Sequence, residues 1–268
     1  MEVRDLVRGT VDWAATEAVA RELADRTGRD EVRVEFLDAD NWLSTPCVVD
    51  EEWFVKIVSR QNAFVHAVFT TGRNLGAVTS GREGFFDHVG SPLEMAEREL
   101  AATVRMREIG VNAPEPVEAF EVDGHGVLVL EYLDDFRTFD DVAADEARRL
   151  TPELFEHLWR MHDDGLAHGD LRGENVLVKG GEVYFIDATS VREDGIANAR
   201  AYDLASALAT LEPMLGTRTV VELALDAYSP GDLLDAREFL DFVNVRPDHD
   251  FDAERLKGEI EKVADASG

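Results

Sequence analysis

Residues 168–187 read His168-Gly-Asp170-Leu-Arg-Gly-Glu-Asn175-Val-Leu-Val-Lys-Gly-Gly-Glu-Val-Tyr-Phe-Ile-Asp187. A polar loop leads into an apolar strand, a Gly-Gly turn and a second apolar strand. A hairpin of this kind returns the chain to its starting point, so we expect Asp187 to lie close to Asp170 and Asn175. This layout is typical of a phosphoryl-transfer site, in which the protein mainly positions ATP, magnesium and a nucleophile.

The polar side chains of this segment have roles that follow from their chemistry. Asp170 would accept the proton of the attacking hydroxyl, or orient that hydroxyl. Asn175 and Asp187 would supply hard oxygen ligands to Mg²⁺, while ATP phosphates and water complete its octahedron. The pattern H-x-D-L-x-x-x-N is matched by His168, Asp170, Leu171 and Asn175. The alternative is an Asx-rich turn in front of an ordinary hairpin.

Lys56 is the only lysine in the first 178 residues of a chain that otherwise relies on arginine. It lies in the run 53–58, Trp-Phe-Val-Lys-Ile-Val, which is strongly strand-forming. An ammonium is a compact point charge on a flexible stem, whereas a guanidinium is a wide planar fork. A lysine at this place therefore indicates a phosphate-binding side chain. A surface lysine on an edge strand is the alternative.

Other elements are expected from periodicity and from helix start and stop signals. Residues 12–27 and 93–109 have the apolar spacing of amphipathic helices, and a glycine follows each. Thr151 and Pro152 read as the cap and first turn of a further helix. Asp203 reads as a residue at the start of another helix, which would begin at about residue 204. Strands are expected at residues 32–37, 47–49, 53–58 and 126–133.

The loop pattern resembles that of the protein kinases. The D-F-G motif of that superfamily is replaced by Asp187-Ala-Thr, which argues against the common eukaryotic class. A strand that ends in Tyr184-Phe-Ile-Asp without D-F-G is similar to the RIO kinases and to the small archaeal kinase of the tRNA threonylcarbamoylation complex. Aminoglycoside phosphotransferases share the same core. The resemblance extends from about residue 32 to about residue 210.

This resemblance implies an α+β fold of the protein-kinase-like bilobal type. The N-lobe would be a small antiparallel β-sheet with one main helix, and the C-lobe would be mainly helical. We expect an N-terminal helical extension at residues 1–30, the N-lobe at 31–133 and the C-lobe at 134–268. Residues 59–92 correspond to a flexible insertion that RIO kinases carry after the strand with the lysine.

The resemblance also implies which residues hold ATP. Lys56 would contact the phosphates and pair with a glutamate of the helix 93–109. Counting back from the glycine that ends this helix selects Glu99, with Glu97 and Glu94 as alternatives.

Four further residues are assigned to nucleotide binding by the same resemblance. Ser44 and Thr45 would contact phosphates, because the segment 38–46 has no glycine-rich motif; an ordinary polar loop is the alternative. Backbone groups of Glu131 and Leu133 would hydrogen-bond the adenine edge.

Two residues around the loop 168–175 are also assigned by this resemblance. Asp203 would anchor the loop, as an aspartate does in many kinase-like folds. Arg172 would either stabilise charge in the transition state or pair with nearby carboxylates.

Three functions fit these observations. The first is an ATP- and Mg²⁺-dependent atypical Ser/Thr protein kinase of the RIO-like kind, with possible autophosphorylation or slow ATP hydrolysis. The second is a small-molecule kinase of the aminoglycoside or sugar type, in which acidic residues such as Asp134 and Asp140 hold a cationic acceptor. The third is an ATP-binding adaptor of a ribosome or tRNA-modification complex. The intact set of catalytic residues counts against a pseudokinase.

The composition excludes several other classes. Acidic residues outnumber basic ones by 56 to 27, and the formal net charge is −29. Direct nonspecific binding to nucleic acid is therefore not expected, because phosphate contacts need clustered lysine and arginine. Cys47 is the only cysteine, so an internal disulfide is excluded. The first residues lack the apolar core of a signal peptide, and no apolar run approaches the roughly 20 residues that span a bilayer. We expect a cytoplasmic protein without a membrane partner.

Proteins of halophiles use a net charge this negative. The charge keeps the protein soluble, although repulsion between the acidic residues destabilises the folded state. We predict a salt-rich cytoplasm. The free energy of unfolding, measured by urea titration, should then rise as KCl increases from about 0.1 M to about 2 M, because salt screens the repulsion. An acidic mesophilic protein is the alternative, and equal stability and activity in dilute buffer would establish it.

Overall fold

The computed structural model of the 268-residue chain describes residues 13–37, 44–59, 91–188, 195–245 and 250–267. These residues form two compact units. The first contains the described residues up to 59 together with 91–104 and 114–133, and the second contains 105–113 and the described residues from 134 onward. The domain boundaries expected from the sequence stay predictions. The expected insertion at 59–92 lies almost wholly outside the described residues.

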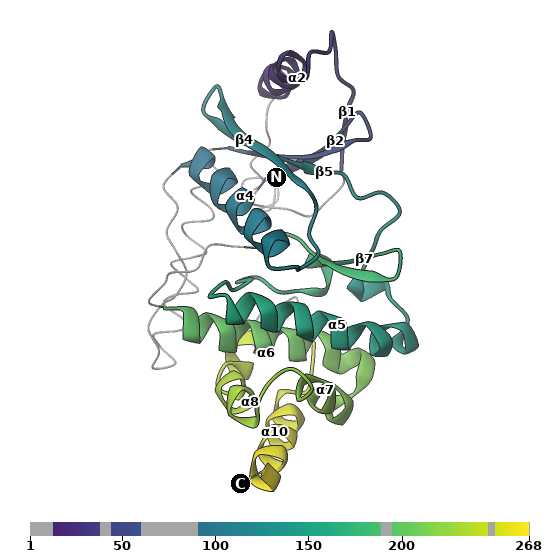
Figure 1. Cartoon of the computed structure of the whole chain (residues 1–268), viewed down its shortest axis with the longest axis vertical. Helices are drawn as coiled ribbons and strands as arrows, with labels where there is room; N and C mark the ends of the chain where they lie inside the picture. The colour runs from purple at the N-terminus through teal and green to yellow at the C-terminus, as the bar shows by residue number, and fades with distance from the viewer. Residues whose placement is uncertain (1–12, 38–43, 60–90, 189–194, 246–249, 268) are drawn as a thin grey trace, which may run out of the picture. The chain divides into compact units, whose positions relative to one another are not determined.

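A five-stranded antiparallel sheet forms the body of the first unit (Figure 1). Its strands are β1 (Val34–Phe36), β2 (Thr45–Val49), β3 (Trp53–Val58), β4 (Pro116–Val122) and β5 (His125–Glu131), in the order β1-β2-β3-β5-β4. The sequence predicts β3 residue for residue but does not predict β4. Pro116 begins this edge strand, and a proline is tolerated there because the first position of an edge strand needs no amide donor.

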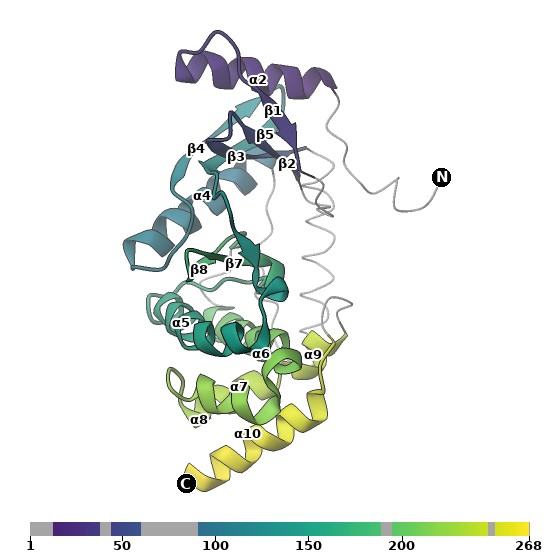
Figure 2. The same ribbon diagram turned by 90° about the vertical axis from the view of Figure 1, so that its right-hand side faces the viewer.

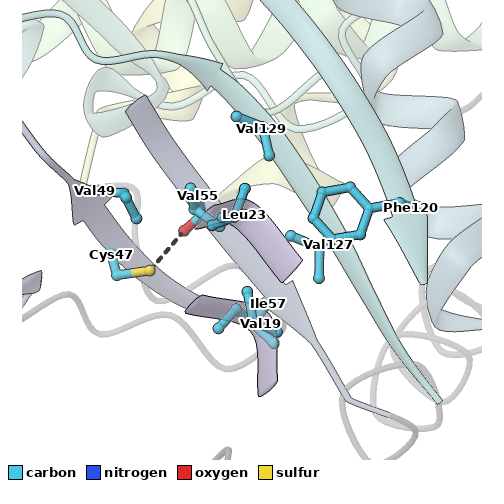
Figure 3. Packing of buried hydrophobic residues seen from close by; sticks show 9 residues of the cluster. All are labelled: Val19, Leu23, Cys47, Val49, Val55, Ile57, Phe120, Val127 and Val129. Atoms are coloured by element: carbon cyan, nitrogen blue, oxygen red, sulfur yellow. Dashed lines mark hydrogen bonds between the residues drawn. The ribbon is translucent and has the colours of Figure 1, made fainter. Parts of the chain in front are cut away.

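Two helices cover opposite faces of this sheet, α2 (Trp13–Thr27) and α4 (Pro92–Glu108) (Figure 2). Side chains alternate between the faces along each strand. The face under α2 is a valine-rich core (Figure 3) made by Val19, Leu23, Cys47, Val49, Val55, Ile57, Phe120, Val127 and Val129. On the other face Leu128 and Leu130 pack against Ala96 of α4. Lys56 is opposite Leu128 in the register, so it lies on the α4 face.

Gly126 allows the start of α4 to approach the sheet closely. A Cβ atom at this position would lie 2.0 Å from the Pro92 carbonyl oxygen and 2.7 Å from the Leu93 amide nitrogen. Both are backbone atoms, so they could move away only if the helix itself shifted. The missing side chain of Gly126 therefore sets the distance between β5 and the helix that carries Glu99.

The second unit is mainly helical (Figure 1). Its helices are α5 (Ala144–Asp163), α6 (Ile196–Leu215), α7 (Thr217–Ala224), α8 (Pro230–Arg237), α9 (Leu240–Asn244) and α10 (Ala253–Ser267). A three-stranded antiparallel sheet has the order β6-β7-β8, with β6 (Arg137–Thr138), β7 (Val176–Lys179) and β8 (Glu182–Phe185). The 3₁₀ turns η1 (Phe139–Asp141) and η2 (Gly173–Asn175) precede α5 and β7. Helix α6 packs on α5, and α7 and α8 contact both α6 and α10.

The expected start of a helix at Thr151 is wrong. Helix α5 begins at Ala144 and continues through Pro152. The run 144–150 is rich in strong helix formers, and the buried Ala147 and Leu150 anchor it to the core. A proline inside a helix leaves the carbonyl four residues earlier without its donor. That residue is exposed, so water can satisfy the carbonyl.

The expected helix start at about residue 204 is also wrong. Helix α6 begins at Ile196, and Asp203 lies in its interior. Alternating alanines between 197 and 201 give this segment a high helix propensity. Asp203 is therefore not a cap, and its side chain is directed into the unit. None of the helices in the described ranges has the length and apolar character needed to cross a bilayer.

Replacing Gly126 by alanine tests the close approach of α4. We expect Gly126→Ala to lower the free energy of unfolding by about 3 kcal/mol, because the new methyl group overpacks against backbone atoms. Gly258→Ala is the matched control, since a Cβ in the middle of α10 would meet nothing within 4 Å. The control should raise stability by about 0.5–1 kcal/mol through helix propensity. Urea titrations of both variants measure this, and a neutral Gly126→Ala would contradict the packing.

Candidate active site

The loop 168–175 is fixed by the buried carboxylate of Asp203. Asp203 Oδ2 accepts a hydrogen bond from the His168 amide at 2.6 Å, and Oδ1 accepts one from the Gly169 amide at 2.8 Å. Asp203 has no exposed surface, so a carboxylate there needs such donors to offset the loss of water. The residue occupies the anchoring position that the resemblance implies.

His168 joins the loop to the end of β8. Its ring Nε2 lies 2.9 Å from the Ile186 carbonyl oxygen, and its Nδ1 lies 3.4 Å from the Asp170 amide nitrogen. Burial lowers the pKa of His168, so the imidazole is neutral. Nε2 then carries the proton and donates to Ile186, while Nδ1 accepts from Asp170. His168 holds the loop in place and is not free to shuttle protons.

Asn175 closes the loop onto Asp170. Its side-chain Nδ2 donates to the Asp170 carbonyl oxygen at 2.8 Å, and its own carbonyl oxygen accepts from the Ile186 amide at 3.1 Å. The side chain is almost fully buried. Because Nδ2 is directed to Asp170, Oδ1 is the atom that can serve as an oxygen ligand. The structure thus brings Asp170, Asn175 and the residue before Asp187 together.

The predicted Gly-Gly hairpin between β7 and β8 is confirmed. Gly180 and Gly181 have φ values of 63° and 89°, and Lys179 pairs with Glu182. Two positive φ angles in a two-residue loop give a turn that matches the twist of the strands. The hairpin therefore returns the chain to the loop at Asp187.

Asp187 has a left-handed backbone, with φ at 61°. Aspartate tolerates this region better than most residues. The other non-glycine residues with positive φ in the described ranges are Asp50, Glu51, Asp123 and Asp135. Those lie in turns, whereas Asp187 follows a strand and adjoins the loop. An unusual backbone angle beside a polar loop is a mark of a functional position.

Two further contacts lie around the loop. Gly173 packs on Asp140 of η1, and a Cβ at Gly173 would lie 1.8 Å from Asp140 Oδ1. Burial raises the pKa of Asp140, and the neighbouring Asp141 adds to this effect. Arg172 Nη2 lies 3.3 Å from Asp170 Oδ2. Of the two roles left open for Arg172, the carboxylate pairing is the one seen here.

Lys56 pairs with Glu99 in the first unit. Its Nζ donates to Glu99 Oε1 at 2.8 Å, and the lysine is buried. The alternative partners are placed otherwise, because Glu97 is exposed and Glu94 pairs with Arg98. A buried ammonium needs such a partner.

Ser44 and Thr45 lie at the start of β2, next to residues 38–43, which are outside the described ranges. Ser44 is buried, and its hydroxyl has no hydrogen-bond partner among the described residues. Thr45 is opposite Ile57 in the register, whereas Lys56 is opposite Pro46. Thr45 and Lys56 are therefore on different faces of the sheet.

The backbone at the end of β5 is partly used by the protein itself. The Glu131 amide donates to the Glu115 carbonyl at 2.8 Å, and the Tyr132 amide donates to the Glu52 carbonyl at 2.9 Å. In the part of the chain that the structure describes, the Leu133 amide has no backbone acceptor. Of these three amides, that of Leu133 is the one left to donate to a ligand.

A metal site made by the protein alone is absent from the described residues. No group of three or more histidine, cysteine, aspartate or glutamate side chains is gathered there. Asn175 and Asp187 offer two oxygen-bearing side chains near the loop, which is a set suited to Mg²⁺ when phosphate and water supply the remaining ligands.

These features define a class of protein. The first unit has an antiparallel sheet, one main helix and a buried Lys56–Glu99 pair. The second is mainly helical and holds the loop 168–175 on Asp203. Together they have the expected α+β organisation of the protein-kinase-like fold.

Comparison with known proteins shows which members of this class the chain is similar to. Residues 89–201 match the family model described as RIO1: RIO domain. This part of the chain is therefore similar to the RIO domain, and the chain is similar to RIO-type kinases and to Bud32, which belong to the protein-kinase-like superfamily.

The chain is similar to two curated proteins and to one solved structure. The KEOPS complex subunit Bud32 of Pyrococcus abyssi is 31% identical over 115 residues, which are 41% of this chain and 51% of Bud32. The RIO-type serine/threonine-protein kinase Rio1 of Haloferax volcanii is 30% identical over 94 residues, which are 34% of this chain and 31% of Rio1. The solved structure of the Neurospora crassa PAN3 pseudokinase has a TM-score of 0.43 and 11% identity, and the match covers 88% of this chain and 63% of PAN3. The chain spans about half the length of Bud32 and about a third of Rio1.

His157 of α5 supports the hairpin that carries Asp187. Its ring packs edge-on against Phe185 at a centroid distance of 6.3 Å. Glu153 Oε1 accepts from the Val183 amide at 3.1 Å and lies 3.5 Å from His157 Nε2. Burial lowers the pKa of His157, although Glu153 opposes the effect.

The lowered pKa of His157 predicts a loss of stability in acid. Below about pH 6.5 the unfolded chain takes up a proton at this histidine that the folded chain does not bind. The free energy of unfolding should then decrease as the pH is lowered, by up to about 1.4 kcal/mol per pH unit for this group. Urea titrations from pH 7.5 to 5.5 should show a shallower fall for His157→Phe than for the native chain. His125→Gln controls for loss of a less buried histidine, and equal slopes in all three proteins would contradict the prediction.

Proposed function

We propose that this chain is an ATP- and Mg²⁺-dependent phosphotransferase, an atypical RIO-like serine/threonine protein kinase. The observation that carries the proposal is the loop 168–175, which Asp203 fixes and which places Asn175 directly against Asp170. In phosphoryl transfer the protein mainly positions the reactants, so a rigid loop of this composition is what the chemistry needs. The similarity to Rio1, named a serine/threonine-protein kinase, supports it.

The second unit would supply the groups around the transferred phosphate. The bound ATP–Mg²⁺ complex supplies the phosphoryl group and its charge neutralisation. Asn175 and Asp187 would hold the metal through side-chain oxygens. Asp170 would orient the acceptor hydroxyl and accept its proton. Arg172, which pairs with Asp170, would limit where that carboxylate points.

The first unit would supply the groups that bind the nucleotide. Lys56, held by Glu99, would contact the phosphates. Ser44 has a buried hydroxyl for which the described residues offer no partner, which suits a phosphate contact, and Thr45 is its neighbour. The Leu133 amide and the Glu131 carbonyl would bind the adenine edge.

The acceptor is a hydroxyl group, and we favour one on a protein, including this chain itself. Autophosphorylation or slow ATP hydrolysis would use the same residues. A small-molecule acceptor of the aminoglycoside or sugar type is the alternative for the same site. The cytoplasmic and halophilic assignments stay predictions.

A second candidate function is that of an ATP-binding adaptor in a ribosome or tRNA-modification complex. The specific observation in its favour is the similarity to Bud32, whose name describes a subunit of the KEOPS complex. An adaptor needs bound ATP but not the base Asp170. Asp170→Asn should therefore abolish turnover in an enzyme and leave the function of an adaptor intact.

The test is transfer of the terminal phosphate of labelled ATP in the presence of Mg²⁺ and concentrated KCl. Asp187→Asn removes the charge but keeps a residue that tolerates a positive φ. We expect it to lower transfer by about 100-fold or more, because it removes the negative charge that would hold Mg²⁺. Asp123→Asn is the matched control, since Asp123 also has a positive φ but lies exposed in the β4–β5 turn. It should transfer phosphate like the native chain.

The possible outcomes separate the functions. Label on the native protein that is lost in Asp187→Asn supports a protein kinase. Label on an added aminoglycoside or sugar instead identifies a small-molecule kinase. Binding of ATP without any transfer favours the adaptor. A native chain that binds no ATP would refute all three.

A further inference from the structure

Tyr228 lies at the end of a chain of hydrogen bonds that leads to the loop 168–175. Its hydroxyl oxygen is 2.9 Å from His162 Nδ1, and His162 Nε2 is 3.3 Å from Asp203 Oδ2. Asp203 accepts hydrogen bonds from the first two amides of the loop, those of His168 and Gly169. We propose that Tyr228 is a positioning residue for this loop and acts on it through His162 and Asp203.

The direction of each hydrogen bond follows from the chemistry of Asp203. An ionised carboxylate can only accept, so the proton between it and His162 belongs to His162 Nε2. The buried Tyr228 hydroxyl has one proton to donate, and His162 Nδ1 is its partner in the described residues. His162 Nδ1 therefore accepts, and the Tyr228 hydroxyl donates to it. The tyrosine thus selects the histidine tautomer that faces Asp203 with a donor.

Tyr228, His162 and Asp203 are buried, so each depends on the others for its hydrogen bonds. The exposed fractions of Tyr228, His162 and Asp203 are 7%, 4% and 0%, so water does not replace a missing partner easily. Burial raises the pKa of Tyr228 well above its usual range, and the charges of Asp203 and Asp232 act in the same direction while Arg200 opposes them. The phenol therefore stays a neutral donor.

A phenylalanine at position 228 would keep the packing but not the donor. The Tyr228 ring contacts Phe155 edge-on at a centroid distance of 6.3 Å and His162 at 5.8 Å, and a phenyl ring can make the same contacts. His162 Nδ1 would then be a buried acceptor without a donor, which is costly. Its ring can relieve this only by moving or by changing its protons, and either change weakens the bond to Asp203.

Asp203 would respond by holding the loop less firmly. Its oxygens receive donors from His168, Gly169 and His162. When one donor of a buried carboxylate is lost, the remaining ones must compensate or the group must move. The backbone before Asp170 would then open more often, although Tyr228 touches neither Asp170 nor a substrate.

Hydrogen exchange of the loop amides tests the inference directly. In Tyr228→Phe the His168 and Gly169 amides should exchange about tenfold faster, as for loss of an ordinary buried hydrogen bond. Amides of β7 serve as the reference, because they report opening of the whole unit. Tyr184→Phe is the matched control, and its loop amides should exchange as in the native chain. Equal acceleration at the loop and in β7, or no acceleration, would overturn the proposal.

Kinetics provide the second readout, which rests on the proposed phosphotransferase function. Tyr228→Phe should lower kcat about tenfold and leave KM for ATP unchanged, because the loop and not the nucleotide contacts is affected. His162→Phe should have a similar effect, and the double variant should lose nothing further, because both changes break the same chain. Additive losses in kcat would overturn the proposal.

Hydrogen exchange and kinetics test the role of Tyr228 independently of each other. If the native chain transfers no phosphate, the function proposed above is wrong, and hydrogen exchange alone decides the role of Tyr228. If His162→Phe does not fold, the single Tyr228→Phe variant still decides it. If transfer is normal in Tyr228→Phe while loop exchange is accelerated, Tyr228 positions the loop as proposed, and the expected dependence of phosphate transfer on that position is overturned.

Discussion

A carboxylate without any exposed surface, that of Asp203, determines the geometry of the loop 168–175. Such a group cannot remain charged in the interior unless donors replace the lost water. Here two backbone amides and one imidazole do so. The donors come from the loop and from α5, so the requirement to satisfy one carboxylate fixes two segments of the second unit at once. The position of Asp170 is a consequence of this requirement.

The β7–β8 hairpin transmits the same constraint to Asp187. Its far end is set by two glycines with positive φ, and its near end is joined to the loop through Ile186, whose amide and carbonyl bond to Asn175 and His168. Each such bond contributes only about 1 kcal/mol net. Together they hold Asp187 in a left-handed conformation that an isolated chain would seldom adopt.

The sequence predicts those parts of the fold whose signals are local. The hairpin follows from Gly180-Gly181 between apolar runs, and β3 follows from its strand-forming residues. The partner of Lys56 could be chosen among three glutamates by counting from a helix end. The starts of α5 and α6 could not be predicted in this way. Alanine-rich segments make both helices begin before the expected start signals at Thr151 and Asp203. Tyr228 has no local signal at all, since it meets His162 only through tertiary packing.

The chemistry of the loop also bears on how an acidic chain would tolerate concentrated salt. Many of its arginines sit in exposed ion pairs with glutamate, such as Arg218 with Glu222, and salt screens exposed pairs strongly. The loop contacts are of another kind, because they join a buried carboxylate to two backbone amides and to a buried imidazole. Mobile ions do not enter such a site, so screening leaves these bonds nearly unchanged. A site built in this way keeps its geometry over a range of salt concentration in which the surface ion pairs contribute little.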